Sequence, residues 1–458
     1  MTRSEELAQH VDAGFEDQLR TLAQLVAIPS VSSDPGMTGE MVRSAETVKA
    51  HFEALGMEAS IEHADAPDGT PGRPAVIAVG EQQEGRPSVL LYAHHDVQPA
   101  GDPSKWSSAP FEMEVREGRA YGRGTSDDGA GVVVHLGALK ALQALGDRGV
   151  NVTVFIEGEE EVGSPSFSNF LNKYRDRLEA DVIVVADSGN WTVDTPAVTS
   201  SLRGMASVDV SLRALDHAVH SGMFGGPVLD AVTLASRLIA TLHDSNGDVA
   251  VAGLGGDPHA QVDWTEGDYR RDASVVEGYE LAGTADLAAR VWTMPAINVI
   301  GMDATSVKDS ANAIIPECTF RLSLRTVPGT SSEQAIAALA QHLEENVPFG
   351  AQIEIVARES GPSYVADLEN PVVELLSEAL EEAWESPSVA IGQGGSIPFI
   401  AEFERVFPDA VVVVTGVEDP ATNAHSEDES QSLKVLRNAT LAEALLLKNL
   451  AEGPSSKD

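Results

Sequence analysis

Four short runs of apolar, mostly β-branched residues stand out in the hydropathy pattern. They are residues 89–92, 152–156, 182–185 and 411–414. Runs without a polar face predict strands that are buried on both sides, as in a mostly parallel sheet covered by helices. Helical patterns separate the runs, for example at residues 132–145. We therefore predict an α/β domain with a mostly parallel sheet sandwiched by helices.

The middle of the chain has a different periodicity. Residues 207–212 and 320–325 alternate apolar and polar positions, which is typical of half-exposed antiparallel strands. Helical patterns flank them at residues 228–242 and 332–344. This pattern predicts a separate α+β domain.

The α+β domain is expected as an insertion at residues 198–365, which leaves a discontinuous first domain made of residues 1–197 and 366–458. After the insertion, the expected elements return to the first domain. They are a helix at residues 371–384, a glycine-rich turn at 392–396, the fourth apolar strand and a closing helix at 433–450.

Charge and composition narrow the classes of partner. The 30 Lys+Arg residues face 71 Asp+Glu residues, for a formal net charge of −41. Nucleic acids and anionic membrane surfaces need a basic surface, so neither is expected as a partner. The pattern has no signal peptide and no run of about 18 apolar residues, so a cytoplasmic protein is expected. The single cysteine, Cys318, lies in a strand pattern and is expected in the core.

Metal-ligand residue types follow each of the four buried strands. The carboxyl ends of parallel strands share one edge of a sheet, so these residues should converge although they are far apart in sequence. A further acidic pair lies between glycines in a tight loop that opens a helix. In chain order the candidates are His94-His95-Asp96, Asp127-Asp128, Glu159-Glu160-Glu161, Asp187 and His425.

Imidazoles mixed with carboxylates favour zinc, manganese or cobalt over magnesium and calcium, which prefer oxygen ligands alone. The carboxylates are too many to cluster without neutralisation, so two cations bridged by one carboxylate is the expected arrangement. Each candidate also has an ordinary alternative: a polar strand end, a helix cap at Asp127-Asp128, or a solvated surface at residues 159–161. Their joint position at strand ends favours a two-metal hydrolase.

Six short segments occur in one order along almost the whole chain. They are Ala93-His94-His95-Asp96-Val97-Gln98-Pro99, Gly122-Arg123-Gly124-Thr125-Ser126-Asp127-Asp128, Glu157-Gly158-Glu159-Glu160-Glu161-Val162-Gly163-Ser164, His220-Ser221-Gly222 with Gly225-Gly226, Gly394-Gly395-Ser396-Ile397-Pro398, and Ala424-His425-Ser426. This set resembles the co-catalytic zinc aminopeptidase-like clan, which contains carnosinase-type dipeptidases, glutamate carboxypeptidases, aminoacylases, acetylornithine deacetylase and succinyl-diaminopimelate desuccinylase.

The resemblance implies a zinc peptidase catalytic domain that holds two divalent cations, Zn²⁺ first, with Mn²⁺ or Co²⁺ as alternatives. It implies that His94 and Asp187 bind one cation and that Glu161 and His425 bind the other. Asp127 would be the bridging carboxylate.

The resemblance also implies roles beside the metals. Glu160 would be the general base and Asp96 would orient the site. The neighbouring Glu159 leaves a shift of one residue open.

The inserted domain would act as a lid and dimerisation domain. By resemblance, His220 would donate to the oxyanion, commonly from the partner subunit of a homodimer. Arg325, with Gly395 and Ser396, would bind a substrate carboxylate. An ordinary loop histidine and an exposed strand arginine remain the alternative interpretations of His220 and Arg325.

The substrate class follows from the inserted domain. Residues 198–365 form a longer insertion than expected for the short-lid deacetylases and desuccinylases, and one similar to that of the carnosinase-like dipeptidases. We therefore predict hydrolysis of dipeptides with a free C-terminal carboxylate. A carboxypeptidase, an N-acyl-amino-acid deacylase, or a metal-binding scaffold without activity are the alternatives.

Overall fold

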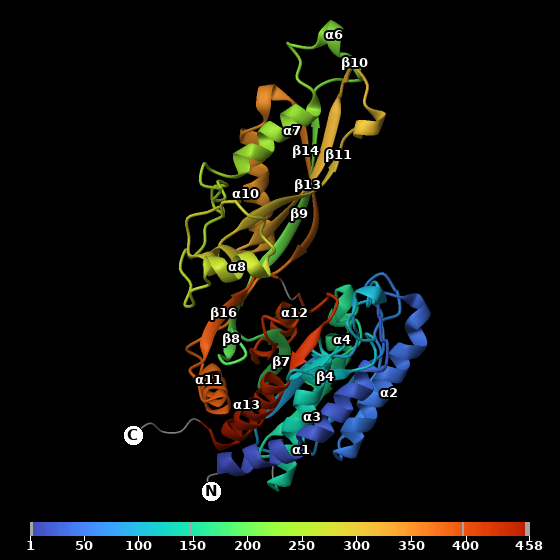
Figure 1. The fold of residues 1–458 in the computed structure, drawn as a ribbon, viewed down its shortest axis with the longest axis vertical. Helices are drawn as coiled ribbons and strands as arrows, with labels where there is room; N and C mark the ends of the chain where they lie inside the picture. The colour runs from blue at the N-terminus through green and yellow to red at the C-terminus, as the bar shows by residue number, and fades with distance from the viewer. Residues whose placement is uncertain (1–2, 147, 396–397, 454–458) are drawn as a thin grey trace. The chain divides into compact units, whose positions relative to one another are not determined.

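A computed structural model describes residues 3–146, 148–395 and 398–453. The chain forms two compact units, drawn in Figure 1. Unit 1 comprises Met1–Ser200, Ala366–Ala390 and Phe399–Asp458, and unit 2 comprises Ser201–Val365 and Ile391–Pro398. The short segment Ile391–Pro398, which the hydropathy pattern placed in the first domain, thus groups with unit 2.

A mixed, mostly parallel sheet forms the centre of unit 1. The first seven of its nine strands, in spatial order, are β1 (Glu58–Glu62), β2 (Ala75–Val79), β6 (Asn151–Glu157), β3 (Ser88–His94), β7 (Val182–Gly189), β17 (Val411–Glu418) and β8 (Ala197–Leu202). β6, β3, β7 and β17 run parallel, whereas β1, β2 and β8 pair antiparallel. The four parallel strands contain the four apolar runs, so the predicted α/β sheet is confirmed.

Both faces of this sheet are buried because alternate side chains meet different layers. On one face, Val89, Leu91 and Ala93 join a core with five helices. These are α1 (Arg3–Val26), α2 (Thr38–Ala54), α3 (Gly129–Ala144), α11 (Pro371–Trp384) and α13 (Leu433–Glu452). Figure 1 shows α1, α3 and α13 side by side, in agreement with their mutual contacts.

Aromatic side chains fill the opposite face. Tyr92 and Phe155 of the sheet pack edge-on at a ring distance of 5.6 Å. Around Tyr92 lie Phe167 of α4 (Phe167–Lys173) and Phe399 and Phe403 of α12 (Pro398–Val406). The short helix α5 (Arg175–Leu178) follows α4. Burial on both faces explains why these strands lack a polar stripe.

A small three-stranded sheet lies outside the central one. It consists of β18 (Ser430–Ser432), β5 (Arg119–Tyr121) and β4 (Glu114–Arg116), with β5 in the middle. β18 and β5 pair antiparallel, with Ser430 opposite Tyr121. This pairing brings the loop after β5 next to the loop before β18, although the two loops lie about 300 residues apart in the chain.

Unit 2 is built on a four-stranded antiparallel sheet. Its order is β11 (Ala296–Asp303), β13 (Glu317–Thr326), β9 (Gly204–Arg213) and β14 (Gln352–Gly361). Val208, Val210 and Leu212 of β9 pack under α7 (Ala231–Ile239) and α10 (Ser332–Glu345). On the other face, Asp209 binds Arg321 at 2.6 Å. This is the half-exposed sheet that the period-two pattern predicts.

The other elements of unit 2 are short. They are β10 (Val219–His220), α6 (Ser221–Phe224), α8 (Glu266–Asp272), α9 (Leu287–Trp292), β12 (Ala313–Ile314) and β15 (Tyr364–Val365). β16 (Val389–Gln393) occupies the start of the expected glycine-rich turn and crosses the boundary between the units. None of the described helices is long and apolar enough to cross a membrane.

Helix caps explain where two helices differ from the predicted bounds. α7 begins at Ala231 and not at residue 228, because the Asp230 side chain accepts a hydrogen bond from the Thr233 N–H and so starts the helix there. α3 begins three residues before the predicted start, because Asp128 caps it through the Gly131 N–H at 2.9 Å. Because Asp128 is the N-cap of α3, Asp127 lies directly before the N-terminus of this helix.

Candidate metal centre

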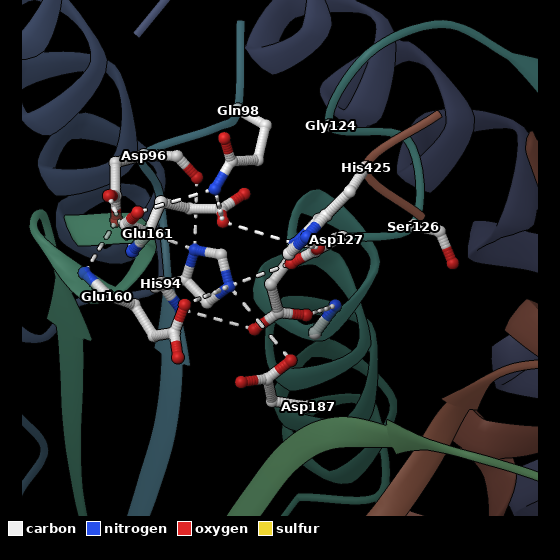
Figure 2. Close-up of polar contacts among 12 residues, drawn as sticks. His94, Asp96, Gln98, Gly124, Ser126, Asp127, Glu160, Glu161, Asp187 and His425 are labelled. Atoms are coloured by element: carbon white, nitrogen blue, oxygen red, sulfur yellow. Dashed lines mark hydrogen bonds and ion pairs between the residues drawn. The ribbon is translucent and has the colours of Figure 1, made fainter. Parts of the chain in front are cut away.

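Three predicted ligands meet at the carboxyl edge of the parallel strands of unit 1. His94 ends β3, Asp187 lies near the end of β7, and Asp127 precedes α3. One ligand atom from each residue lies within 4.8 Å of the other two. Figure 2 shows the three side chains pointing toward one another.

A second group adjoins the first. Asp127, Glu161 and His425 also bring one ligand atom each within 4.8 Å of one another. His425 Nε2 lies 2.8 Å from Asp127 Oδ2 and 3.2 Å from Glu161 Oε2. His94 Nε2 lies 3.0 Å from the other oxygen of Asp127, Oδ1. Asp127 is therefore common to both groups and presents one oxygen to each.

The state of His94 fits a cation ligand. Its Nδ1 lies 3.0 Å from the carbonyl oxygen of Asp96, which suits donation from a protonated Nδ1. Its Nε2 is buried and has no hydrogen-bond partner among the described residues, despite the nearby Asp127 carboxylate. A lone pair on Nε2 that faces carboxylate oxygens is satisfied by a cation between them. The donor set, imidazole nitrogen with carboxylate oxygens, suits zinc, manganese or cobalt.

The charges of the cluster also call for cations. Burial raises the pKa of Asp187 well above its usual value and that of Glu160 to about 7, with nearby carboxylates adding to both shifts. Hydrogen bonds with Asp127 and Glu161 raise the pKa of His425 to about 10. Burial alone would raise the pKa of Asp127, but the two histidines hold it well below its usual range. Positive charge is thus stabilised at both groups, as divalent cations would require.

Asp96 holds the acidic turn that follows β6. Its carboxylate accepts hydrogen bonds from the backbone N–H groups of Glu160 at 3.2 Å and Glu161 at 3.1 Å. Because the carbonyl oxygen of Asp96 also contacts His94 Nδ1, Asp96 connects His94 of the first ligand group with the turn that carries Glu161 of the second. Asp96 lies two residues beyond the end of β3, so the loop after this strand places its carboxylate.

The three consecutive glutamates have different surroundings. Glu160 Oε2 lies 4.0 Å from His94 Nε2, and Glu161 contacts His425. Glu159 is buried away from the cluster, where its carboxylate accepts the backbone N–H groups of Arg73 at 3.0 Å and Ser166 at 2.6 Å. Glu160 and Glu161 therefore face the cluster (Figure 2), whereas the hydrogen bonds of Glu159 hold it away from the cluster.

Sequence reasoning missed three side chains that support the ligands. Gln98 donates from Nε2 to Glu161 Oε2 at 2.7 Å. Arg123 and Glu429 form a buried ion pair beside Asp127. Gln98 and Arg123 lie inside two of the six segments quoted above, but nothing in the neighbouring residues indicates that their side chains support a ligand. Glu429 follows His425 by four residues, in a stretch that reads as an ordinary acidic loop.

The remaining predicted residues belong to unit 2. His220 is exposed at the start of α6, and its Nδ1 accepts a hydrogen bond from the Gly222 N–H at 3.1 Å. Arg325 is partly buried near the end of β13, and Gly395 is exposed. Ser396 lies outside the described residues.

Arg203, which the pattern did not suggest, is a buried arginine in unit 2. Its guanidinium donates to the carbonyl oxygens of Gly394 at 3.2 Å, Met294 at 3.3 Å and Arg290 at 3.4 Å. Burial, with the charge of Arg325 nearby, lowers the pKa of Arg203 to about 10. Within the part of the chain that the structure describes, Arg203 has no carboxylate partner.

Residues 90–449 match the peptidase family M20/M25/M40. The chain belongs to this family. Across most of its length it is similar to the cysteinylglycine-S-conjugate dipeptidase of Corynebacterium striatum, with 32% identity over 93% of this chain and 94% of the relative. It is also similar to the Cys-Gly metallodipeptidase dug1 of Schizosaccharomyces pombe, with 27% identity over 94% of each chain.

Solved structures agree on the fold of this M20/M25/M40 family member. The dipeptidase Dug1p of Saccharomyces cerevisiae superposes with a TM-score of 0.78 at 21% identity, over 99% of both chains. The predicted resemblance to the zinc peptidase clan and the predicted two-part fold class are therefore confirmed. The predicted enzyme class, a metal-dependent peptidase of the dipeptidase type, is confirmed as well by the family and by these relatives.

Proposed function

We propose that this chain hydrolyses the peptide bond of dipeptides that carry a free C-terminal carboxylate, with the help of two divalent cations. The observation that supports this most directly is Asp127, whose two oxygens serve two adjacent ligand groups. His94 and Asp187 would complete one group, and Glu161 and His425 the other. When bound, the cations would polarise the scissile carbonyl and lower the pKa of a water molecule.

Glu160 would be the general base. Its carboxylate lies at the edge of the cluster, and burial raises its pKa to about 7, close to the pH at which such an enzyme operates. A carboxylate in this range accepts a proton from water and returns it to the leaving amine. Asp96 would keep Glu160 in place through the hydrogen bond to its backbone N–H.

Unit 2 would recognise the substrate carboxylate. Arg325 and Arg203 lie close enough for the charge of one to lower the pKa of the other, and no acid pairs with Arg203 among the described residues. A carboxylate accepts from a guanidinium in a bidentate geometry and would relieve this repulsion. Gly395 and Ser396 stay predicted donors to the same group.

Dipeptides and their C-terminal amides should separate this recognition from catalysis. In Arg325→Ala, kcat/KM for a dipeptide with a free carboxylate should fall by about 10- to 100-fold, mainly through KM, because a charged hydrogen bond of about 1.5–3 kcal/mol is lost. Activity on the dipeptide amide should change little. The measurement is steady-state hydrolysis with added Zn²⁺ or Mn²⁺.

The matched control for Arg325→Ala is Arg321→Ala, on the same strand, because Arg321 pairs with Asp209 on the exposed face. Equal losses in the two variants would contradict the carboxylate role. The substrate panel should include N-acetyl amino acids and tripeptides. Turnover of only those compounds would replace the dipeptidase with a deacylase or a carboxypeptidase, and no turnover at all would favour a metal-binding scaffold.

Three further assignments stay predictions. They are Zn²⁺ as the native metal, a cytoplasmic location, and the division into a catalytic domain at 1–197 and 366–458 and a lid and dimerisation domain at 198–365. A homodimer through unit 2 is supported by its edge strand β11, which exposes Val299, Ile300 and Met302. Exposed apolar side chains on an unpaired strand edge favour association.

His220 would act on the oxyanion from the partner subunit. Because its Nδ1 accepts the Gly222 N–H, the proton is left on the exposed Nε2, as a donor requires. Mixing inactive Glu160→Gln protein with inactive His220→Ala protein should restore activity, since mixed dimers contain one site with both intact residues. Subunit exchange, followed by mass, without any recovery would place His220 in the same chain as its metal site.

A further inference from the structure

The buried ion pair between Arg123 and Glu429 joins the two loops that carry Asp127 and His425. Arg123 Nη1 lies 2.7 Å from Glu429 Oε2, and the exposed fractions of the two side chains are 2% and 0%. The partners are 306 residues apart in the chain. Neither side chain belongs to the two ligand groups.

Glu429 receives four hydrogen bonds. Its Oε1 accepts the backbone N–H groups of Ser126 at 3.0 Å and Asp127 at 3.1 Å. Its Oε2 accepts the Gly124 N–H at 3.1 Å in addition to Arg123. Three of the four donors are therefore backbone groups of the loop that carries Asp127. One carboxylate thus determines the path of this loop at three points.

Arg123 extends the connection to the second loop. Its Nη2 donates to the carbonyl oxygen of Ser426 at 3.1 Å, and to that of Pro99 at 3.4 Å. Ser426 directly follows His425, whose backbone has a positive φ of 62°. The guanidinium also lies 5.4 Å from the ring centre of Trp106. The ion pair therefore contacts both the loop that carries Asp127 and the loop that carries His425.

Stability alone does not explain this pair. Taking two charges out of water costs about as much as their attraction returns, so a buried pair is weak evidence for stabilisation. The strands next to these two loops, β5 and β18, already pair with each other. Arg119 of β5 adds hydrogen bonds to Asp419 at 3.0 Å and to Ser430 at 2.8 Å. What Arg123 and Glu429 add is the placement of the two ligand loops.

We propose that Arg123 and Glu429 are positioning residues that hold Asp127 and His425 at the spacing required to bind both cations. This inference depends on the proposed function, in which Asp127 and His425 are ligands. Supporting groups behind metal ligands typically change metal affinity or activity by about 10- to 100-fold when they are lost.

Glu429→Gln tests the proposal. Glutamine has one acceptor oxygen, so its NH₂ must face the N–H groups of Ser126 and Asp127 or that of Gly124, and the loop has to shift. We expect the affinity for Zn²⁺, measured by competition with a chromogenic chelator, to fall by about 10- to 100-fold. Much of the lost kcat should return at saturating Zn²⁺, which a merely destabilised protein would not show. Unchanged Zn²⁺ affinity would overturn the proposal.

A matched pair of milder variants serves if Glu429→Gln does not fold. Arg123→Lys keeps the charge but loses the fork that reaches the carbonyl oxygens of Ser426 and Pro99, so it should also weaken Zn²⁺ binding. Arg119→Lys makes the same chemical change on β5 and should leave Zn²⁺ affinity as in the wild type. Equal losses in both lysine variants, with equal shifts of the unfolding temperature in EDTA, would overturn the positioning role.

The wild type separates this inference from the proposed function. If the wild-type chain binds two Zn²⁺ ions and hydrolyses dipeptides but the variants bind as it does, only the positioning role fails. If the wild type itself binds no cation, the proposed function fails, and the positioning role fails with it.

Discussion

Replacing Glu160 by glutamine should lower kcat for dipeptides by about 10²- to 10⁴-fold, the usual contribution of a general base. An amide of the same shape cannot accept the proton of the attacking water. Both cations should still bind, because Glu160 belongs to neither ligand group. KM should change little. The measurements are steady-state kinetics and the Zn²⁺ content of the purified variant.

Glu159→Gln is the matched control, since it makes the same change one residue earlier. Among the described residues, the carboxylate of Glu159 accepts the backbone N–H groups of Arg73 and Ser166 and does not face the cluster, so this variant should lose stability and keep its kcat at temperatures where it is folded. A large loss of kcat in Glu159→Gln, with Glu160→Gln near wild type, would move the base to Glu159. That outcome would mean that the orientations of the glutamates differ in the working enzyme.

Asp127→Asn should remove both cations, whereas Asp187→Asn should remove one. The reason is that Asp127 contributes an oxygen to each ligand group and Asp187 contributes to a single group. Loss of both cations should lower kcat/KM by more than about 10³-fold, because carbonyl polarisation by a metal is worth several kcal/mol. Metal content after dialysis against a fixed concentration of Zn²⁺ gives the stoichiometry.

The comparison of these two variants isolates the bridging role. Equal metal contents in Asp127→Asn and Asp187→Asn would mean that the two groups bind independently. Added Zn²⁺ should restore Asp187→Asn more readily than Asp127→Asn, since Asp187→Asn keeps all three residues of the second group and two of the three in the first.

Much of the fold follows from local patterns. The four parallel strands were predictable because strands buried on both faces have no polar stripe, and α10 and α11 because their apolar periodicity is local. The convergence of His94 and Asp187 was also predictable, since parallel strands end at the same edge of a sheet. The starts of α3 and α7 were less so, because a capping side chain decides them.

Other features depend on contacts between distant segments. Three adjacent glutamates look alike in the chain, and only the hydrogen bonds of Asp96 and of the Arg73 and Ser166 backbone separate Glu160 from Glu159. The absence of an acid beside Arg203, in the described part of unit 2, is likewise a property of packing and not of sequence.

By itself, the sequence determined the class of fold, the family and the chemical types at the metal centre, because periodicity and ordered motifs are local properties. The tertiary structure alone decided that Asp127 offers one oxygen to each ligand group and that Arg123 and Glu429 bind each other across 306 residues. Such pairings depend on which loops the sheets bring together. No local pattern encodes them, because each partner is an ordinary polar residue in its own segment.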